Sequence, residues 1–113
     1  MASYVKNKEL REEIKLSREK DELTRKALDM LILMSRRFSY NFKYFYEEDR
    51  EDCISFAVMD CYLYWRGYDP DKSQNAFAYY SQIIKNGFAK GWNTLYGKMT
   101  FGDKTSLNNI HSL

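Results

Sequence analysis

The side chains best suited to contact another molecule lie in one stretch near the C-terminal end of the chain. Residues 72–92 read K-S-Q-N-A-F-A-Y-Y-S-Q-I-I-K-N-G-F-A-K-G-W, with lysines, amides and aromatic rings but no carboxylate. Lysine pairs with phosphate, glutamine and asparagine hydrogen-bond to base edges, and tyrosine stacks on unpaired bases. These residue types, gathered in one stretch, point to nucleic-acid binding.

The distribution of charge along the chain favours the same interpretation. The net charge of the 113 residues is only +2. Residues 1–71 hold 13 basic and 15 acidic side chains, a balance of −2, whereas residues 72–102 hold four lysines and no acid, a balance of +4. A basic patch next to an acidic body is a charge pattern typical of proteins that bind nucleic acid.

Helical periodicity predicts the elements that must position these side chains. We expect helices from 7 to about 20, from about 21 to 37, from near 47 to about 66, and from 76 to about 92 with Asn75 as its cap. The sequence has neither strand-like alternation nor an internal repeat. The predicted fold is therefore all-α, a small helical bundle of about four to five helices. One domain is expected over 1–95, followed by a flexible C-terminal tail over 96–113.

In projection, the last predicted helix has two different faces. The face expected in the core carries Ala76, Phe77, Tyr80, Ile83, Ile84, Gly87 and Phe88. The other face carries Ala78, Tyr79, Gln82, Lys85, Asn86, Ala89 and Lys90. An ordinary solvated face is the alternative interpretation, but solvated helices usually mix both signs of charge, so it leaves the missing carboxylates unexplained.

The third predicted helix is apolar on both sides. Its core stripe is expected to consist of Ile54, Ala57, Val58, Cys61, Trp65 and Tyr68. The opposite side carries Asp52, Ser55, Phe56, Met59 and Leu63. A helix of this kind needs a second neighbour, which is either the rest of the bundle, for example the aromatic segment 38–46, or another protein.

The sequence lacks the usual parts of a catalytic site. It has one histidine, His111, and no nucleophile motif or metal-ligand spacing, so we predict a protein that is not an enzyme and needs no cofactor. Cys53 and Cys61 stand eight apart and are expected to be buried free thiols. Because there is no long apolar run and no signal-peptide core, we expect a cytoplasmic protein without a membrane partner.

Several short motifs, in order, resemble a known family. Residues 49–92 resemble the second conserved region of bacterial sigma factors, which engages core RNA polymerase and the melted minus-ten promoter element. The resemblance is closer still to the late-transcription sigma factors of T-even-like bacteriophages and covers about 4–92. Its markers are Y-V-K-N-K-E-L at 4–10, S-R-R-F at 35–38, Y-D at 68–69 and N-A-F-A-Y-Y-S-Q at 75–82.

The resemblance implies a polymerase-docking surface on the third helix. Its residues would contact the clamp helices of the largest polymerase subunit through Asp52, Ser55, Phe56 and Met59. Primary sigma factors usually have a glutamine and a glutamate where Ser55 and Phe56 stand, so the docking surface here is expected to be more apolar. An interface at this place would explain the second apolar side of the helix.

The resemblance also implies roles for the last helix. Tyr79 falls where the family places an aromatic ring near the flipped minus-ten base, and Asn86 and Lys90 fall where the family grips the upstream duplex edge. Primary sigma factors wedge DNA open with a tryptophan pair, and Gln82 and Ile83 stand at its place here. The phage late factors also lack that pair. Lys85, on the same face, is expected to pair with phosphate. The predicted DNA-binding residues are therefore Tyr79, Gln82, Lys85, Asn86 and Lys90.

Two further partners stay open at this point. The phage late factors lack a domain for the minus-thirty-five element and carry an acidic, hydrophobic C-terminal tail that binds the sliding clamp. This chain ends S-L-N-N-I-H-S-L, with apolar residues but no acid. The resemblance therefore allows a sliding clamp or a phage coactivator as a partner, and the sequence of the tail does not show whether the chain binds either.

The sequence thus predicts a phage-type minimal sigma factor, a specificity subunit that brings host core RNA polymerase to late promoters in the infected bacterial cell. The alternative is a polymerase-binding adapter, a coactivator or anti-sigma protein, that does not contact DNA. A plain structural bundle would bind neither.

Four lysines neutralise at most about four phosphates, which gives an electrostatic association constant of only about 10²–10³ M⁻¹ near 0.1–0.2 M salt. Sequence-specific DNA binding is therefore expected only on the polymerase, where the contacts become intramolecular.

Overall fold

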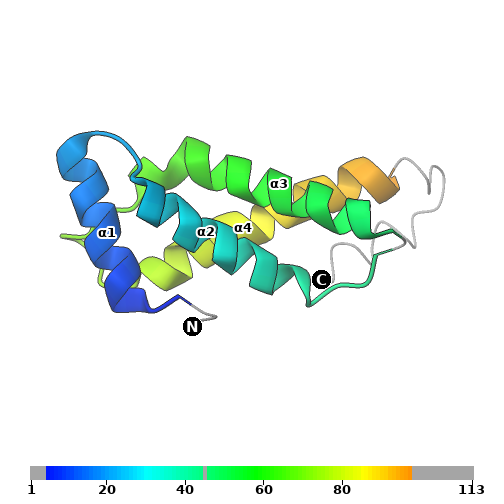
Figure 1. The fold of residues 1–113 in the computed structure, drawn as a ribbon, viewed down its shortest axis with the longest axis horizontal. Coiled ribbons are helices and arrows are strands. Elements are labelled where there is room, and N and C mark those ends of the chain that lie inside the picture. Colours follow the sequence, from blue (N-terminus) through cyan, green and yellow to red (C-terminus); the bar gives the residue numbers. More distant parts are fainter. Residues whose placement is uncertain (1–4, 45, 98–113) are drawn as a thin grey trace.

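In the part of the chain that the structure describes, three α-helices of 15 to 18 residues run along the molecule, and a fourth, of 14 residues, lies across one end of them (Figure 1). The computed structural model describes residues 5–44 and 46–97. The helices are α1 (Asn7–Lys20), α2 (Arg25–Ser39), α3 (Glu47–Tyr64) and α4 (Ala76–Trp92), with a 3₁₀ turn at Trp65–Gly67 and a π-helix at Asn93–Gly97. This part of the chain contains no strand. The predicted all-α helical bundle is confirmed.

Side-chain caps set where two of the helices begin. The Asn75 side chain accepts a hydrogen bond from the Ala78 N–H at 2.9 Å, as the sequence predicted. Thr24 caps α2 in the same way through Ala27, at 3.1 Å, so the expected start of that helix at residue 21 is wrong. Asp21 instead adopts the left-handed conformation, with φ 59°, and closes α1.

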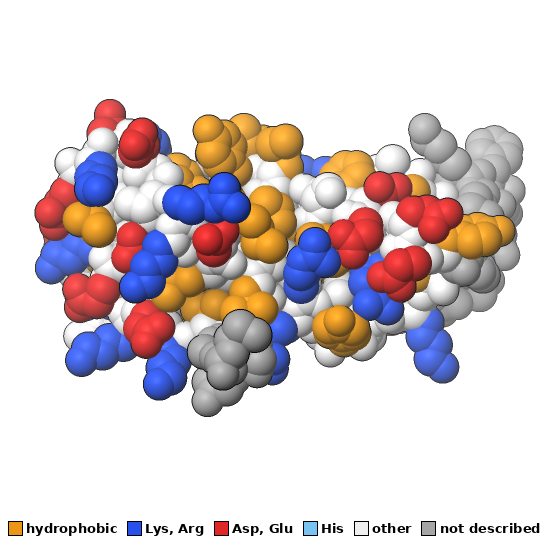
Figure 2. All heavy atoms as spheres, in the orientation of Figure 1, with side chains coloured by type: hydrophobic (Ala, Val, Ile, Leu, Met, Phe, Trp, Pro, Cys, Tyr) orange, Lys and Arg blue, Asp and Glu red, His pale blue; other side chains and the backbone are white. Residues whose placement is uncertain are grey.

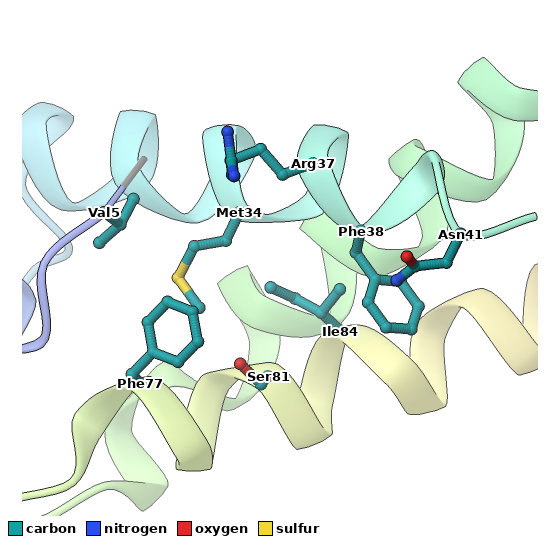
Figure 3. Close-up of a pocket in the computed structure, with 8 residues that line it drawn as sticks. All are labelled: Val5, Met34, Arg37, Phe38, Asn41, Phe77, Ser81 and Ile84. Carbon is teal, nitrogen blue, oxygen red and sulfur yellow. The ribbon is translucent and has the colours of Figure 1, made fainter. Parts of the chain in front are cut away.

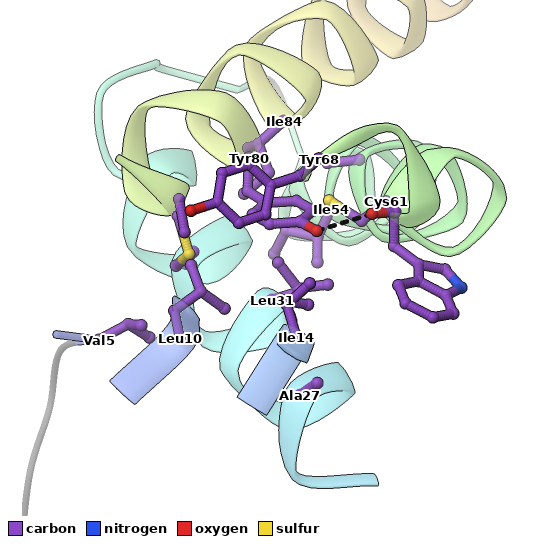
Figure 4. Close-up of a cluster of buried hydrophobic side chains, with 14 of the residues drawn as sticks. Val5, Leu10, Ile14, Ala27, Leu31, Ile54, Cys61, Tyr68, Tyr80 and Ile84 are labelled. Atoms are coloured by element: carbon purple, nitrogen blue, oxygen red, sulfur yellow. Dashed lines mark hydrogen bonds between the residues drawn. The ribbon is translucent and has the colours of Figure 1, made fainter. Parts of the chain in front are cut away.

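The buried core draws side chains from all four α-helices (Figure 4). Leu10 and Ile14 of α1 lie near Leu31 of α2 in the figure, Ile84 of α4 belongs to the same cluster, and all four are fully or almost fully buried. The Tyr80 ring is buried in the same cluster, where its hydroxyl donates a hydrogen bond of 2.7 Å to the Trp65 carbonyl. A buried tyrosine needs such a partner for its hydroxyl, so this bond completes the core.

Two glycines bring α3 and α4 unusually close together. A Cβ atom added at Gly87 would lie 2.6 Å from the Cα of Ala57. At Gly91 it would lie 3.0 Å from the ring of Phe56 and 3.3 Å from the Cα of Cys53. The interface between these helices is therefore built on backbone contact rather than on large interlocking side chains.

The aromatic segment after α2 packs on α4 and not on the outer side of α3. The rings of Phe38 and Phe42 lie 5.1 and 5.9 Å from the ring of Phe88. Phe42 and Tyr44 in turn contact Trp92, at 6.0 and 5.8 Å between centroids. Tyr40 and Tyr44 also stack against the guanidinium of Arg50, at 4.8 and 5.8 Å, so the segment contacts α3 near its N-terminal end and leaves Met59 on the outer side of that helix exposed.

The structure corrects the predicted core placement of Phe77 and locates Phe56 and the start of the predicted tail. Phe77, expected in the core, is 43% exposed at the start of α4. Phe56, expected on the docking surface, is half-buried over Gly91. The predicted tail, 96–113, lies outside the described residues except for Tyr96 and Gly97, which are helical, and the Tyr96 hydroxyl donates to Asp49 at 2.7 Å. His111 also lies outside the described residues, within which no helix is long and apolar enough to cross a membrane.

The two cysteines are buried and free, as predicted. Burial, with Asp49 beside Cys53 and Asp60 beside Cys61, raises the pKa of each thiol from 9.0 to about 12. At pH 8 the thiolate fraction should be roughly a thousandfold lower in the folded than in the unfolded protein. We therefore expect iodoacetamide to leave the native protein unmodified while it alkylates both cysteines in denaturant, as mass spectrometry would reveal.

The same pKa shifts predict how stability changes with pH. Because both thiols have a higher pKa in the folded protein, their contribution is fully present below pH 9 and is lost as the pH rises toward about 12. Urea unfolding in this alkaline range should show a steeper fall in stability for the wild type than for a double Cys→Ala variant. Rapid alkylation of the native protein at pH 8 would contradict the buried placement.

Candidate nucleic-acid and protein-docking surfaces

The outward side of α4 is accessible and polar, as the sequence predicted. We define the α4 outer face as Ala78, Gln82, Lys85, Asn86 and Ala89, all of which are exposed. The Gln82 side-chain amide donates a hydrogen bond of 3.0 Å to the side-chain oxygen of Asn86, which aligns the two amides along the helix. Lys85 makes no ion pair with any described residue, so its charge is available to an anionic partner.

Lys90, at the end of the same helix, has a carboxylate partner. Its ammonium lies 2.9 Å from an oxygen of Asp60 on α3, whose side chain is only 8% exposed. The hydrogen bond to Asp60 raises the pKa of Lys90. The acid-free surface predicted from the sequence therefore ends before Lys90, because packing brings a carboxylate of α3 up beside it.

Tyr79 is held in a cluster of tyrosines. Its ring lies 5.6 Å from that of Tyr68 and 5.1 Å from that of Tyr80, and it is half-buried. A Cβ at Gly67 would overlap the Tyr79 hydroxyl, so glycine leaves the room that this ring occupies. Tyr79 can present only part of its ring to a partner.

A pocket that sequence reasoning missed lies between α2 and α4 (Figure 3). The α2–α4 pocket has a volume of ≈ 420 Å³, within the range of small-molecule sites. Apolar side chains form most of its lining, and polar groups come from Arg37, Asn41 and Ser81. The full lining is Val5, Met34, Arg37, Phe38, Asn41, Phe77, Ser81 and Ile84.

The chemistry of this pocket suits a flat ring that carries polar edges. Exposed Phe77 and partly exposed Phe38 offer aromatic surface, and Asn41 and Ser81 offer hydrogen-bonding groups. The sequence did not reveal the pocket, because Asn41 follows the end of α2 and the helix that completes the pocket begins 35 residues later.

A second hollow runs between α2 and α3. The α2–α3 groove has a volume of ≈ 420 Å³ and is lined by Leu28, Ile32, Arg36, Glu51, Ile54, Ser55, Val58, Met59 and Tyr62. Met59 and Tyr62 are 56% and 58% exposed, and Arg36 pairs with Glu51 across the groove at 3.2 Å. Figure 2 shows hydrophobic side chains gathered over the middle of this side of the molecule.

The groove includes only part of the predicted docking set. Ser55 and Met59 line it, Asp52 is exposed outside its lining, and Phe56 is turned toward α4. The sequence did not identify Leu28 and Ile32, which face the groove from α2. Helix α2 thus forms one wall of the groove and one wall of the α2–α4 pocket.

Comparisons with protein-family models, with curated proteins and with solved structures find no match to this chain.

Proposed function

We propose that this chain is a minimal sigma factor of the phage late-transcription type. In this proposal the α2–α3 groove binds host core RNA polymerase, and α4 contacts the unpaired minus-ten-like element of late promoters. The observation that carries the proposal is the exposed, acid-free α4 outer face beside a pocket of suitable size for one base. The resemblance of the motifs between residues 4 and 92 supports it independently.

Each surface has chemistry that fits its proposed partner. Lys85 pairs with a phosphate, and the aligned amides of Gln82 and Asn86 meet base edges. An unpaired base enters the α2–α4 pocket, where Phe77 stacks on it and Asn41 and Ser81 bind its polar edge. The α2–α3 groove receives a helix of the polymerase on its apolar floor, with the Arg36–Glu51 pair at the edge.

Electrostatics makes the proposed DNA binding conditional on the polymerase. Lys90 is compensated by Asp60, which leaves Lys72 and Lys85 as the exposed lysines of residues 72–97 without an ion pair. Two phosphate contacts give an electrostatic association constant of only about 10 M⁻¹ near 0.15 M salt. Stacking of one base adds roughly 1–3 kcal/mol, so the free protein should hardly bind DNA.

The experiment is a comparison of DNA binding with and without core polymerase. We expect run-off transcription from A·T-rich late promoters, and a specific shift of promoter DNA, only when core polymerase and this protein are both present. The protein alone should give no specific shift up to micromolar concentration. A tight, sequence-specific complex with the free protein would contradict the proposal, as would failure to retain core polymerase.

A polymerase-binding adapter that does not touch DNA is the second candidate. The ion pair between Lys90 and Asp60 favours it, since that contact removes one of the expected DNA contacts without any partner present. Such an adapter would still bind polymerase through the groove. It would, however, be indifferent to substitutions on the α4 outer face, which separates the two functions.

A further inference from the structure

Asn7, at the start of α1, ties two distant parts of the chain together. Its side-chain oxygen accepts a hydrogen bond of 2.8 Å from the N–H of Phe77, 70 residues away. Its side-chain nitrogen donates to the carbonyl of Gln74, also at 2.8 Å. Both polar ends of one side chain are therefore used to hold the beginning of α4.

These bonds complete the N-terminal cap of α4. Asn75 takes the N–H of Ala78, and Asn7 takes the N–H of Phe77, for which no carbonyl of the helix itself is available. Two side-chain amide oxygens therefore accept from two of the N–H groups at this end of the helix.

The contact also lies at one end of the α2–α4 pocket. Val5 stands two residues before Asn7, and Phe77 is the residue whose N–H bonds to Asn7; both line the pocket, at the same end of it in Figure 3. Val5 is 8% exposed, whereas the Phe77 ring is 43% exposed. The Asn7 side chain thus links the segment before α1 to the first turn of α4 at this end of the pocket.

We propose that Asn7 is a positioning residue that holds the α2–α4 pocket in the shape that admits an unpaired base. It acts through the backbone of Phe77 and does not itself line the pocket. The identity of the occupant rests on the proposed function, whereas the mechanical role of Asn7 does not. The two can therefore fail separately.

Other contacts between α1 and the segment before α4 provide a matched control. Arg11 donates a hydrogen bond of 2.9 Å to the carbonyl of Pro70, and Arg18 donates to that of Tyr68 at 3.0 Å. Neither arginine lines the pocket or contacts the first turn of α4. Arg11→Ala therefore loosens the same helix without releasing the Phe77 backbone.

The first test measures amide hydrogen exchange of the free protein by NMR. Asn7→Ala should speed exchange of the Phe77 N–H roughly 2- to 12-fold, the range expected for loss of one hydrogen bond, and should shift the Val5 methyl signals. Asn7→Asp keeps a side-chain oxygen that accepts from the Phe77 N–H, so exchange of this N–H should stay close to the wild-type rate. Unchanged exchange in Asn7→Ala, or an equal increase in Arg11→Ala, would overturn the positioning role.

The second test follows the base itself. Promoter DNA with 2-aminopurine at successive positions of the minus-ten-like element is opened with core polymerase and each variant. Asn7→Ala should lose most of the fluorescence change at one position while polymerase affinity stays constant, and Asn7→Asp should restore it. Normal fluorescence with Asn7→Ala would overturn the link to base binding. If wild-type protein opens no promoter, the proposed function fails and the exchange result alone decides the role of Asn7.

Discussion

Reversing the charge of Lys85 is expected to remove most promoter opening while polymerase binding stays intact. Lys85 is the exposed lysine at the centre of the α4 outer face and has no ion-pair partner in the described structure. Losing one phosphate contact and adding one repulsion should lower opening roughly 10- to 70-fold between 0.15 and 0.05 M salt. The measurement is the rate of open-complex formation over a salt series.

The salt series also gives the number of contacts. In a plot of the logarithm of the opening rate against the logarithm of the salt concentration, Lys85→Gln should reduce the slope by about 0.7. Lys85→Glu should reduce it by about 1.4 if repulsion counts as a second lost contact. Lys26→Glu is the control, because it makes the same change of charge at an exposed site at the start of α2.

Met59→Lys, in the α2–α3 groove, should instead abolish polymerase retention and opening together.

Three results would count against this account. If Lys85→Glu opens promoters as well as wild type, the adapter function is favoured over the sigma function. If it loses polymerase binding, the α4 outer face belongs to the protein interface. If Lys26→Glu is equally impaired, the effect reflects net charge and not the position of Lys85.

Most of the fold could be predicted from the sequence because its signals are local. The spans of α1 and α4 follow from composition and from Asn75, which caps a helix by bonding only three residues ahead. The start of α2 was missed, since Asp21 belongs to the helix pattern but adopts a left-handed conformation that the pattern does not reveal. Thr24 was the better signal, as a capping residue before the apolar stripe.

The candidate site was predictable only where it depends on one helix. The outward direction of Gln82, Lys85 and Asn86 follows from the helical period of α4 alone. The partner of Lys90 lies 30 residues earlier, on α3, so it depends on how two helices pack. The α2–α4 pocket is of the same kind, because its walls come from α2, α4 and the segment before α1.

Replacing Gly87 with alanine should destabilise the protein by about 2 kcal/mol. The new Cβ would lie 2.6 Å from the Cα and 3.1 Å from the backbone nitrogen of Ala57, which cannot move unless α3 and α4 separate. Overpacking costs roughly 1–3 kcal/mol, here near the upper end because the neighbour is backbone, and the better helix propensity of alanine returns about 1 kcal/mol. A shift in melting temperature of roughly 10 °C follows for a domain of this size. Circular dichroism during thermal and urea unfolding measures it.

Gly91→Ala is the matched variant, one turn further along the same interface. Its Cβ would meet the ring of half-buried Phe56 at 3.0 Å, and that ring can turn aside. The nearest backbone atom, the Cys53 Cα, lies at 3.3 Å and needs to give by only a few tenths of an ångström, far less than the Ala57 backbone at Gly87. We therefore expect this variant to stay within about 1 kcal/mol of wild type, since helix propensity offsets the closer contact. Equal stability of both variants would mean that α3 and α4 have room to move apart. In that case the position of Lys90 against Asp60, which depends on the same spacing, would also be adjustable, and Lys90 could rejoin the surface offered to DNA.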